Sequence, residues 1–328
     1  MSQFTVATDV MLGLATSVRP VSYDADGLMR LLWVKDKVMY SFYKNVLIST
    51  PADLPDFMVE AAPFLKAVRA AKSKEMKFNM TDGGNLTISA GRLRTRMGLI
   101  TEPVPEVHAV QSWSAVQEGL LSTLGTMSKL VPDAAPQLWA TTLLFRNGYA
   151  FAADGTYLVR QKLPVEFEFE CAMTRPLLDI LVKLKAQPTS MAYQQGMMHF
   201  SVTGNINLSC PVTTHKWPDV SKFFVAEYHM EPITDEFKEV VAQLQTYNEG
   251  LAIIRINADG KAVCRFPSDQ LANQVVDIQF EETSFKRNLN LSIQHLSRFI
   301  KDASFIGYGN KLIVLDDSIR TIILSETH

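Results

Sequence analysis

The sequence lacks the short motifs that mark the commonest classes of enzyme. It contains no GxSxG, no phosphate-binding P-loop, no GxGxxG and no HExxH segment. Its six histidines show no spacing typical of metal ligands, and its paired carboxylates, Asp316-Asp317 and Glu281-Glu282, lie in turn-like segments. We therefore expect a protein that is not an enzyme and has no catalytic residue, no bound metal and no cofactor.

Cysteine and long apolar runs are also scarce. The three cysteines form no CxxC pair, and their odd number favours buried free thiols in a reducing cytoplasm; they are Cys171, Cys210 and Cys264. No apolar run is long enough to span a membrane, since the longest, at residues 28–34, is interrupted by Arg30. The N-terminal residues have no basic start followed by an apolar stretch, which argues against a signal peptide. We expect a cytoplasmic protein without a membrane partner.

The charge shows no excess of one sign. With 32 basic and 34 acidic residues the net charge is −2, which excludes a protein that coats nucleic acid through bulk positive charge. A protein that places basic residues on one face and acidic residues on another remains compatible with this balance. The 328 residues are 47% hydrophobic, enough for more than one buried core.

What the sequence does contain is a long internal repeat. Three stretches share one plan, in which a short extended segment leads into a helix with basic residues and then into two strands joined by a turn. These stretches begin at Phe57, Phe169 and Leu289. The matching leucines of their helices lie 113 and 118 residues apart, at Leu65, Leu178 and Leu296. Three units of this length account for nearly the whole chain.

The first half of each unit contains a further helix and a hairpin. We expect these helices over residues 8–18, 113–130 and 235–247. In the second of them one face is apolar, formed by Trp113, Val116, Leu120, Leu124 and Met127. Hairpin turns are predicted at Lys35-Asp36-Lys37, Arg146-Asn147-Gly148 and Asp259-Gly260; in the last two, Asn-Gly and Asp-Gly favour type I′ turns. Each unit therefore reads helix, strands, helix, strands.

Proline-containing connectors mark the ends of the first two units. They are Glu102-Pro103-Val104-Pro105 and the segment from Trp217-Pro218 to Val225, and proline suits a junction because it cannot donate to a strand ladder. We expect an α+β protein with three repeated domains at residues 1–108, 109–226 and 227–328.

This layout and several local phrases resemble the bacterial beta sliding clamp, a DNA polymerase processivity factor. Phe151-Ala-Ala-Asp-Gly-Thr-Tyr-Leu-Val resembles the family's phrase in which a strand ends at Thr-Asp-Gly and resumes with Arg-Leu-Ala. Trp217-Pro-Asp-Val-Ser-Lys-Phe-Phe resembles its phrase Phe-Pro-Asp-Tyr followed by basic residues, and Phe4-Thr-Val resembles its opening strand. The sequence departs from the family's phrases at three places, which indicates a divergent member of bacterial or phage origin. These are Thr156, Tyr157 and the final Leu324-Ser-Glu-Thr-His.

The resemblance implies a ring. Each clamp domain would place two helices inside and antiparallel sheets outside, and two three-domain chains would close head to tail as a homodimer. Double-stranded DNA would pass through the ring without being read for sequence, at replication forks in a bacterial or phage-infected cell. The DNA-facing residues would be the basic residues of the repeated second helices: Lys66, Arg69, Lys72, Lys74, Arg175, Lys183, Lys185, Arg298 and Lys301. A solvated helix face is the alternative interpretation.

The resemblance also implies a pocket between the second and third domains. This pocket would receive short apolar peptides from the replicative DNA polymerase and the clamp loader. By residue match its walls would be Gly155, Thr156, Tyr157, Leu158, Pro218, Phe223 and the last strand at Ile322 and Leu324. Some of these side chains would be core residues under the alternative interpretation.

Two other interpretations stay open at this point. One is an interaction protein built of duplicated domains with no DNA at its centre, and the other is a hydrolase or transferase with a site assembled from scattered residues. Arg92, Arg94 and Arg96 alternate along a predicted strand and so share one face, which fits either a nucleic-acid stripe or a solvated outer surface.

Overall fold

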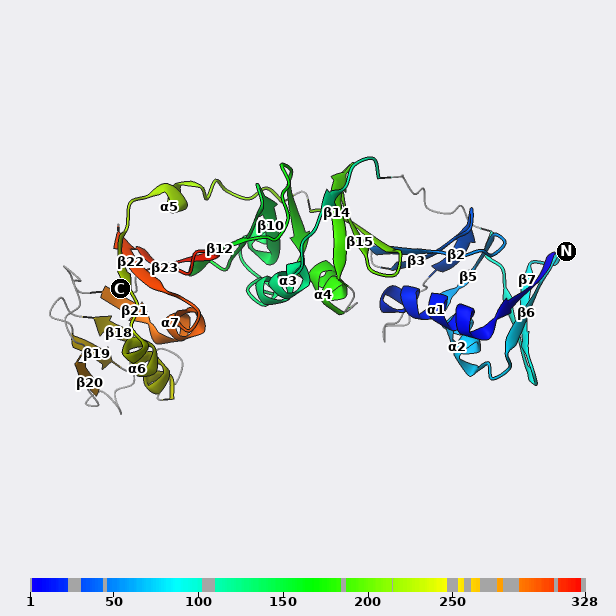
Figure 1. The fold of residues 1–328 in the computed structure, drawn as a ribbon, viewed down its shortest axis with the longest axis horizontal. Helices are drawn as coiled ribbons and strands as arrows, with labels where there is room; N and C mark the ends of the chain where they lie inside the picture. Colours follow the sequence, from blue (N-terminus) through cyan, green and yellow to red (C-terminus); the bar gives the residue numbers. More distant parts are fainter. Residues whose placement is uncertain are drawn as a thin grey trace. The chain divides into compact units, whose positions relative to one another are not determined.

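The computed structural model describes residues 2–22, 31–43, 46–101, 110–183, 187–213, 215–246, 253–256, 261–265, 276–279, 289–309 and 312–325. They belong to two compact units that alternate along the chain (Figure 1). Unit 1 comprises Met1–Lys129, Phe145–Gly148 and Leu163–Thr214. Unit 2 comprises Leu130–Leu144, Tyr149–Lys162 and His215–His328.

One order of elements recurs six times: a strand, a helix and three strands, which we call a half-domain. The first consists of β1 (Ser2–Ala7), α1 (Thr8–Ser22), β2 (Leu31–Lys35), β3 (Val38–Tyr43) and β4 (Val46–Pro51). The second consists of β5 (Phe57–Glu60), α2 (Ala61–Ala70), β6 (Glu75–Thr81), β7 (Asn85–Ala90) and β8 (Leu93–Gly98). The third consists of β9 (Ser114–Ala115), α3 (Leu120–Ser128), β10 (Thr142–Arg146), β11 (Tyr149–Ala153) and β12 (Tyr157–Lys162), with a 3-10 turn at Leu138–Thr141.

The later half-domains repeat this order. The fourth consists of β13 (Glu170–Thr174), α4 (Arg175–Lys183), β14 (Pro188–Gln194), β15 (Met197–Val202) and β16 (Ile206–Pro211). A short helix, α5 (Lys222–Val225), precedes the fifth, which consists of β17 (His229–Pro232), α6 (Asp235–Thr246), β18 (Ile253–Ile256), β19 (Lys261–Arg265) and β20 (Val276–Gln279). The sixth consists of β21 (Leu289–Ser292), α7 (Ile293–Ile300), β22 (Phe305–Gly309), β23 (Leu312–Asp316) and β24 (Arg320–Ser325). The predicted order of helices and strands is confirmed.

Neighbouring half-domains exchange their first strands. In unit 1, β1 pairs with β6 of the second half-domain, and β5 pairs with β2 of the first. In unit 2, β17 pairs with β22 and β21 pairs with β18 in the same way. Because each sheet contains a strand from the other half-domain, the two halves cannot separate without breaking ladder hydrogen bonds, and they form one domain.

The last strands of half-domains join sheets to each other. In unit 1, β4 pairs antiparallel with β16, so that the strands run in the order β5-β2-β3-β4-β16-β15-β14-β9. In unit 2, β12 pairs antiparallel with β24, which joins the strands β10-β11-β12 to the strands β24-β23-β22-β17. Among the described strands, β8 and β20 are the last strands that end a sheet, since the remaining sheets are β1-β6-β7-β8 and β20-β19-β18-β21.

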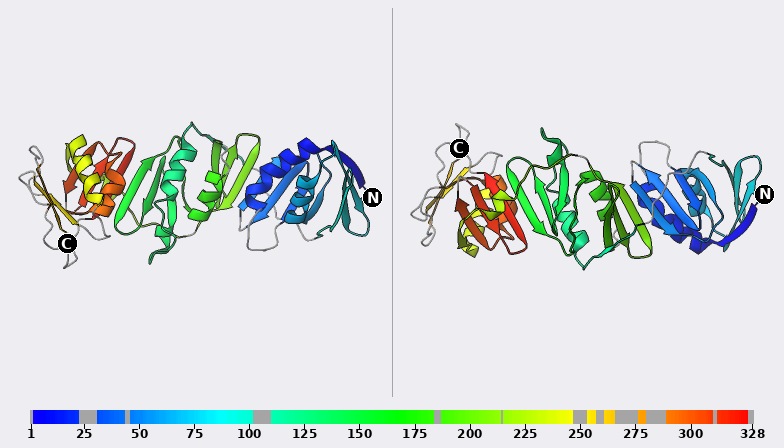
Figure 2. Two further views of the ribbon diagram at one scale, coloured as in Figure 1. Left: turned by 90° about the horizontal axis from the view of Figure 1, so that it is seen from below. Right: turned by 90° about the horizontal axis from the view of Figure 1, so that it is seen from above.

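Pairs of helices cover one face of the sheets within each unit (Figure 2). The contacting pairs are α1 with α2, α3 with α4, and α6 with α7. α2 shows how such a helix is anchored: Phe64, Leu65 and Val68 are fully buried at helical spacing. Phe64 lies against Phe78 of β6, which in turn stacks on Phe4 of β1 at 4.7 Å between ring centroids.

The predicted helix at residues 113–130 is wrong in its first half. Ser114 and Ala115 form strand β9, Val116 bridges to Val165, and the helix begins only at Leu120. Gly119, at φ 98°, sets that boundary because such a backbone conformation cannot continue into a helix toward the N-terminus. Trp113 and Val116, although spaced as in a helix, therefore belong to an extended segment. Only Leu120, Leu124 and Met127 share the helix face.

Two predicted turns are confirmed, and both central residues of each have the positive φ that a type I′ turn requires. Asp36 and Lys37 have φ of 52° and 63°, and Asn147 and Gly148 have φ of 49° and 77°. The predicted turn at Asp259-Gly260, the connector at residues 102–105, the pair Glu281-Glu282 and the boundary at residues 108/109 lie outside the described residues.

Cys171 and Cys210 are free and buried, as expected for core thiols. Burial is the main cause that raises the pKa of both, to about 12 for Cys210. No helix in the part of the chain that the structure describes is long and apolar enough to cross a membrane.

Two glycines test how the α3 start depends on backbone conformation. A Cβ added at Gly119, or at Gly13 inside α1, would meet no non-neighbouring atom within 4 Å, so backbone conformation rather than a steric clash decides the effect at both sites. Gly119→Ala should lower the free energy of unfolding by about 1 kcal/mol, whereas Gly13→Ala should raise it by about 0.5–1 kcal/mol. Urea denaturation followed by circular dichroism measures both; a stabilising Gly119→Ala would contradict this account of the helix start.

Candidate partner-binding pocket and basic helix faces

Unit 2 contains an apolar cavity of about 350 Å³ beside the seam between β12 and β24. Four segments supply its walls: the 3-10 turn before β10, the β11–β12 turn with the start of β12, the segment that leads into α5, and strands β23 and β24. The lining residues are Trp139, Ala153, Gly155, Thr156, Tyr157, Leu158, Pro218, Asp219, Val220, Lys222, Phe223, Leu312, Ile323 and Ser325.

The register of the seam decides which side chains reach the cavity. Leu158 lies opposite Ile323, and Tyr157 lies opposite Leu324. Opposite residues of an antiparallel pair project to the same face, and successive residues project to alternate faces. Leu158 and Ile323 therefore share the cavity face, while Ile322 and Leu324 are buried away from it.

The β11–β12 turn is fixed by one carboxylate. Asp154 Oδ1 accepts hydrogen bonds from the Thr156 backbone N–H at 2.8 Å, the Thr156 hydroxyl at 2.6 Å and the Tyr157 N–H at 3.1 Å. Gly155 adopts φ 95°, a conformation that favours glycine. This turn brings Thr156 and Tyr157 to the cavity lining, although the Tyr157 ring projects to the opposite face of the strand, toward α7.

Tyr157 links the cavity to α7. Its ring lies edge-on to Phe299 at 5.3 Å, and its hydroxyl donates to the Leu130 carbonyl at 2.6 Å. Arg298 lies over the ring at 5.2 Å and donates to the same hydroxyl at 3.4 Å. Burial first, and the Asp154 carboxylate second, raise the pKa of Tyr157, while Arg298 lowers it. The phenol therefore stays protonated, and can donate, at neutral pH.

The connector wall is held in place by tryptophan. Trp217 is buried and donates from Nε1 to the Thr142 hydroxyl at 2.8 Å. Its ring contacts that of Trp139 at 4.8 Å between centroids. Asp219 then accepts from both the N–H and the hydroxyl of Ser221, which precedes α5. This arrangement holds Pro218 and Val220 against the cavity.

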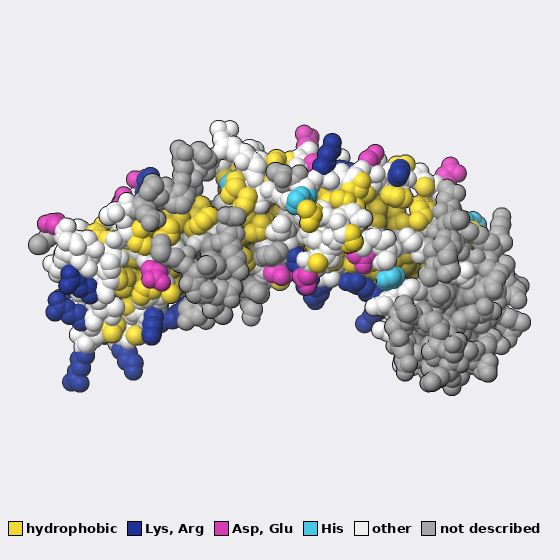
Figure 3. Space-filling view, turned by 180° about the vertical axis from the view of Figure 1, so that it is seen from behind, with side chains coloured by type: hydrophobic (Ala, Val, Ile, Leu, Met, Phe, Trp, Pro, Cys, Tyr) yellow, Lys and Arg dark blue, Asp and Glu magenta, His cyan; other side chains and the backbone are white. Residues whose placement is uncertain are grey.

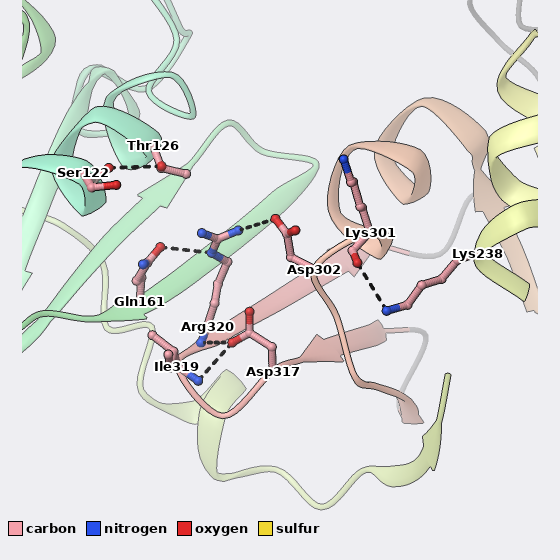
Figure 4. A network of polar contacts seen from close by, with 9 residues as sticks. All are labelled: Ser122, Thr126, Gln161, Lys238, Lys301, Asp302, Asp317, Ile319 and Arg320. Carbon is pink, nitrogen blue, oxygen red and sulfur yellow. Dashed lines mark hydrogen bonds and ion pairs between the residues drawn. The ribbon is translucent and has the colours of Figure 1, made fainter. Parts of the chain in front are cut away.

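A polar cluster fastens the far end of the seam (Figure 4). Arg320 donates from Nε to Gln161 at 3.0 Å and contacts the Asp302 carboxylate at 3.6 Å. Asp317 accepts from the backbone N–H groups of Ile319 and Arg320, which shapes the β23–β24 turn. The hairpin β23–β24 is thus tied to β12 beyond its ladder hydrogen bonds.

The structure brings together six of the eight residues predicted for the pocket. These are Gly155, Thr156, Tyr157, Leu158, Pro218 and Phe223. At β24 the lining residues are Ile323 and Ser325 in place of Ile322 and Leu324, because the register turns the latter pair inward. Sequence reasoning also missed Trp139, Lys222 and Leu312; only Lys222, within the phrase that begins at Trp217-Pro218, carried a signal that could have found it. That a partner occupies this cavity stays a prediction.

The predicted DNA-facing residues of unit 1 lie on and after α2 and on α4. Lys66 and Arg69 are exposed on α2, and Lys72 and Lys74 are exposed just beyond it. Figure 3 shows lysine and arginine side chains gathered toward the N-terminal end of this unit. Arg175 at the start of α4 contacts Asp179 at 3.9 Å. Lys183 ends α4 but its side chain is not described, and Lys185 lies outside the described residues.

The predicted DNA-facing residues of unit 2 lie at the end of α7. Lys301 is exposed, and its carbonyl accepts a hydrogen bond from Lys238 of α6 at 3.2 Å. Arg298 is exposed and also contacts Tyr157. A lysine from each helix therefore lies at the same end of the pair.

Arg94 and Arg96 share one exposed face of β8, as their alternation predicts, and Arg92 is exposed in the preceding turn. Among the described residues no group of three His, Cys, Asp or Glu side chains could hold a metal ion.

Six half-domains, four of which join through their last strands, define a three-domain α+β clamp fold with an apolar pocket at one seam. Solved structures that share this fold include bacterial beta sliding clamps. The clamp of Bacillus subtilis matches with a TM-score of 0.74 at 12% identity, covering 99% of both chains. The Helicobacter pylori beta clamp bound to a DNA ligase peptide matches at 0.73 and 12%, covering 100% of both.

A third example is the sliding clamp of Pseudomonas aeruginosa bound to griselimycin, at TM-score 0.73 and 12% identity over 99% of both chains. No protein-family model matches the sequence, and neither does any curated protein. At these identities the likeness establishes the fold, and the expected three-domain α+β clamp architecture is confirmed.

Tyr157→Phe tests the link between the pocket and α7. The change keeps the ring but leaves the Leu130 carbonyl without its 2.6 Å donor, so the free energy of unfolding should fall by about 1–2 kcal/mol. Since folding raises the Tyr157 pKa, the wild type should also lose stability as the pH rises above about 10, and the variant should lack that part of the pH dependence.

Chemical denaturation at several pH values measures both effects. Tyr149→Phe is the matched control, because the Tyr149 hydroxyl makes no hydrogen bond to a described residue, and it should change stability by less than about 0.5 kcal/mol. Equal effects of the two substitutions would refute the role of the Tyr157 hydroxyl.

Proposed function

We propose that this protein is a DNA sliding clamp, a processivity factor that encircles duplex DNA and tethers the replicative DNA polymerase without catalysing a reaction. The observation that carries the proposal is that beta clamps share its fold over 99–100% of the chain. Domain boundaries at residues 1–108, 109–226 and 227–328, and a place at replication forks in the cytoplasm of a bacterial or phage-infected cell, belong to the same proposal.

The pairing of last strands supports a homodimeric ring. β4 pairs with β16 and β12 pairs with β24, while β8 and β20 each have one partner among the described strands. If β8 of one chain paired with β20 of a second chain, each last strand would have a last strand beside it, and two chains would close head to tail. The charges agree, since β8 carries Arg94 and Arg96 whereas β20 carries Asp277 and no basic residue.

Reversing the β8 charges should open the ring. We expect Arg94→Glu with Arg96→Glu to weaken the dimer at least about tenfold, because opposite-charge cross-strand pairs contribute roughly 0.2–1 kcal/mol each and like charges oppose pairing. Mass photometry over a concentration series gives the dissociation constant, and negative-stain electron microscopy shows whether a ring with a central hole is present.

Lys35→Glu with Lys162→Glu is the control, since it makes the same change in net charge at exposed residues of strands that share no sheet with β8. A wild-type protein that is monomeric and shows no ring over the whole concentration range would contradict the clamp and favour an interaction protein of duplicated domains.

Basic residues on and beside α2 support contact with DNA. Lys66, Arg69, Lys72 and Lys74 are all exposed and follow one another at the end of the same helix, which concentrates positive charge there. Clamp function requires charge toward phosphates without contacts to base edges, so that the ring can slide. Arg175, Lys183, Lys185, Arg298 and Lys301 would continue this lining.

Reversal of the α2 cluster tests the DNA-facing assignment. Lys66, Arg69, Lys72 and Lys74 changed together to Glu should weaken duplex binding at low salt at least about tenfold and flatten its salt dependence, because each lost phosphate contact removes about 0.9 from the logarithmic slope. Fluorescence anisotropy with a labelled random-sequence duplex at several salt concentrations provides the measurement.

The matched control changes four other exposed lysines to Glu and so has the same net charge as the test variant. These are Lys35, Lys77, Lys162 and Lys216. If both quadruple variants lose affinity equally, bulk charge rather than the α2 face is responsible, and the assignment fails.

The pocket supports recruitment of partners. A cavity of about 350 Å³ with aromatic and aliphatic walls fits the apolar anchors of a short peptide. A Helicobacter pylori beta clamp of the same fold is bound to a DNA ligase peptide. The proposed occupants here are peptides of the replicative polymerase and of a clamp loader.

A further inference from the structure

The wall of the pocket formed by α5 has little to hold it in place. α5 spans only Lys222–Val225 and contains no buried residue, and Val225 is 79% exposed. Phe223 lines the cavity, whereas Phe224 does not. A helix of one turn is not stable by itself, so its position has to come from contacts with the rest of unit 2.

Side chains outside α5 contact it: the Tyr228 hydroxyl donates to the Phe223 carbonyl at 2.9 Å, and Arg160 of β12 contacts the Phe224 side chain. Its guanidinium lies over the Phe224 ring at 4.4 Å and over the Tyr149 ring at 5.1 Å. Phe224 also meets Phe151 of β11 edge-on, at 5.7 Å between centroids. The Phe224 ring is thus held between a cation and an aromatic ring on two adjacent strands, an arrangement favoured by the electron-rich face and electron-poor edge of such rings.

Arg160 is itself fixed by the seam. Arg160 Nη2 donates to the Thr321 hydroxyl of β24 at 3.1 Å, and that hydroxyl donates to Asp316 at 2.7 Å. Arg160 lies opposite Thr321 in the β12–β24 register, two residues from the pair Leu158 and Ile323 on the same face. One side chain therefore contacts α5 and both strands that carry the floor of the pocket.

We propose that Arg160 is a positioning residue for partner binding, which holds α5 so that Phe223 closes the pocket. This inference rests on the proposed function of the pocket. Arg160 does not line the cavity and acts through Phe224. Without it, α5 would populate detached conformations, and the apparent affinity for a peptide would fall in proportion to the fraction of molecules with α5 in place.

The first experiment measures α5 without any ligand. Trypsin cleaves after Lys222, which is exposed but lies within α5, so cleavage requires local opening. In Arg160→Met the rate of cleavage at this bond, followed by mass spectrometry, should rise at least about fivefold. Arg160→Lys, which keeps a cation, should fall between wild type and Arg160→Met, and Phe224→Leu should match Arg160→Met without any change in β12.

The second experiment measures peptide binding. The probe is a fluorescein-labelled copy of the DNA ligase peptide seen with the Helicobacter pylori clamp, and the readout is anisotropy. Arg160→Met should weaken binding about tenfold. The melting temperatures of this variant and the wild type are also compared, because a similar value shows that the loss of affinity is not caused by global unfolding. Arg146→Met is the control, since Arg146 pairs with Glu170 in unit 1 and is not among the residues that line the pocket.

The outcomes separate this inference from the function on which it rests. Faster cleavage together with weaker binding supports it. An unchanged cleavage rate, or faster cleavage with unchanged affinity, overturns it. A wild-type protein that does not bind the peptide at all removes that ligand class from the pocket, and the cleavage rates then still decide whether Arg160 holds α5.

Discussion

The rest of this structure depends on the antiparallel pairing of last strands, β4 with β16 and β12 with β24. The first strand of each half-domain lies in the sheet of its neighbour. The last strand has backbone hydrogen-bonding groups along its outer edge that need a partner. Joining last strands turns small sheets into long ones and builds a chain of domains. Among the described strands the same constraint leaves β8 and β20 with one partner each, and these are the strands that the proposed dimer would pair.

The β12–β24 seam also creates the pocket. Its register sends Leu158 and Ile323 to one face and Tyr157 and Leu324 to the other. One face thereby becomes a shallow apolar floor under α5, while the other contacts α7 through Tyr157. Successive residues of β12 thus line the apolar pocket and contact a helix with exposed basic residues, and substitutions in β12 should affect both.

Much of the fold could be predicted from the sequence. The repeat was visible in matching leucines such as Leu65 and Leu178, and the hairpins were visible where positive φ is required, as at Asn147 and Gly148. The start of α3 was not, because Trp113 and Val116 fit a helical period by chance and Gly119 alone carries the boundary. Six pocket residues were found from two local phrases, but at β24 a shift of one residue changed the lining.

The sequence by itself determined the number of repeats, the order of elements, most turns and the location of the basic helices, because these follow from periodicity and backbone preference within short segments. The exchange of first strands, the register of β12 against β24 and the contact of Arg160 with Phe224 were decided only by the tertiary structure. Each joins residues far apart in the chain. A one-residue change of register would reverse every side chain of a strand, and no local pattern specifies which register the packed domain adopts.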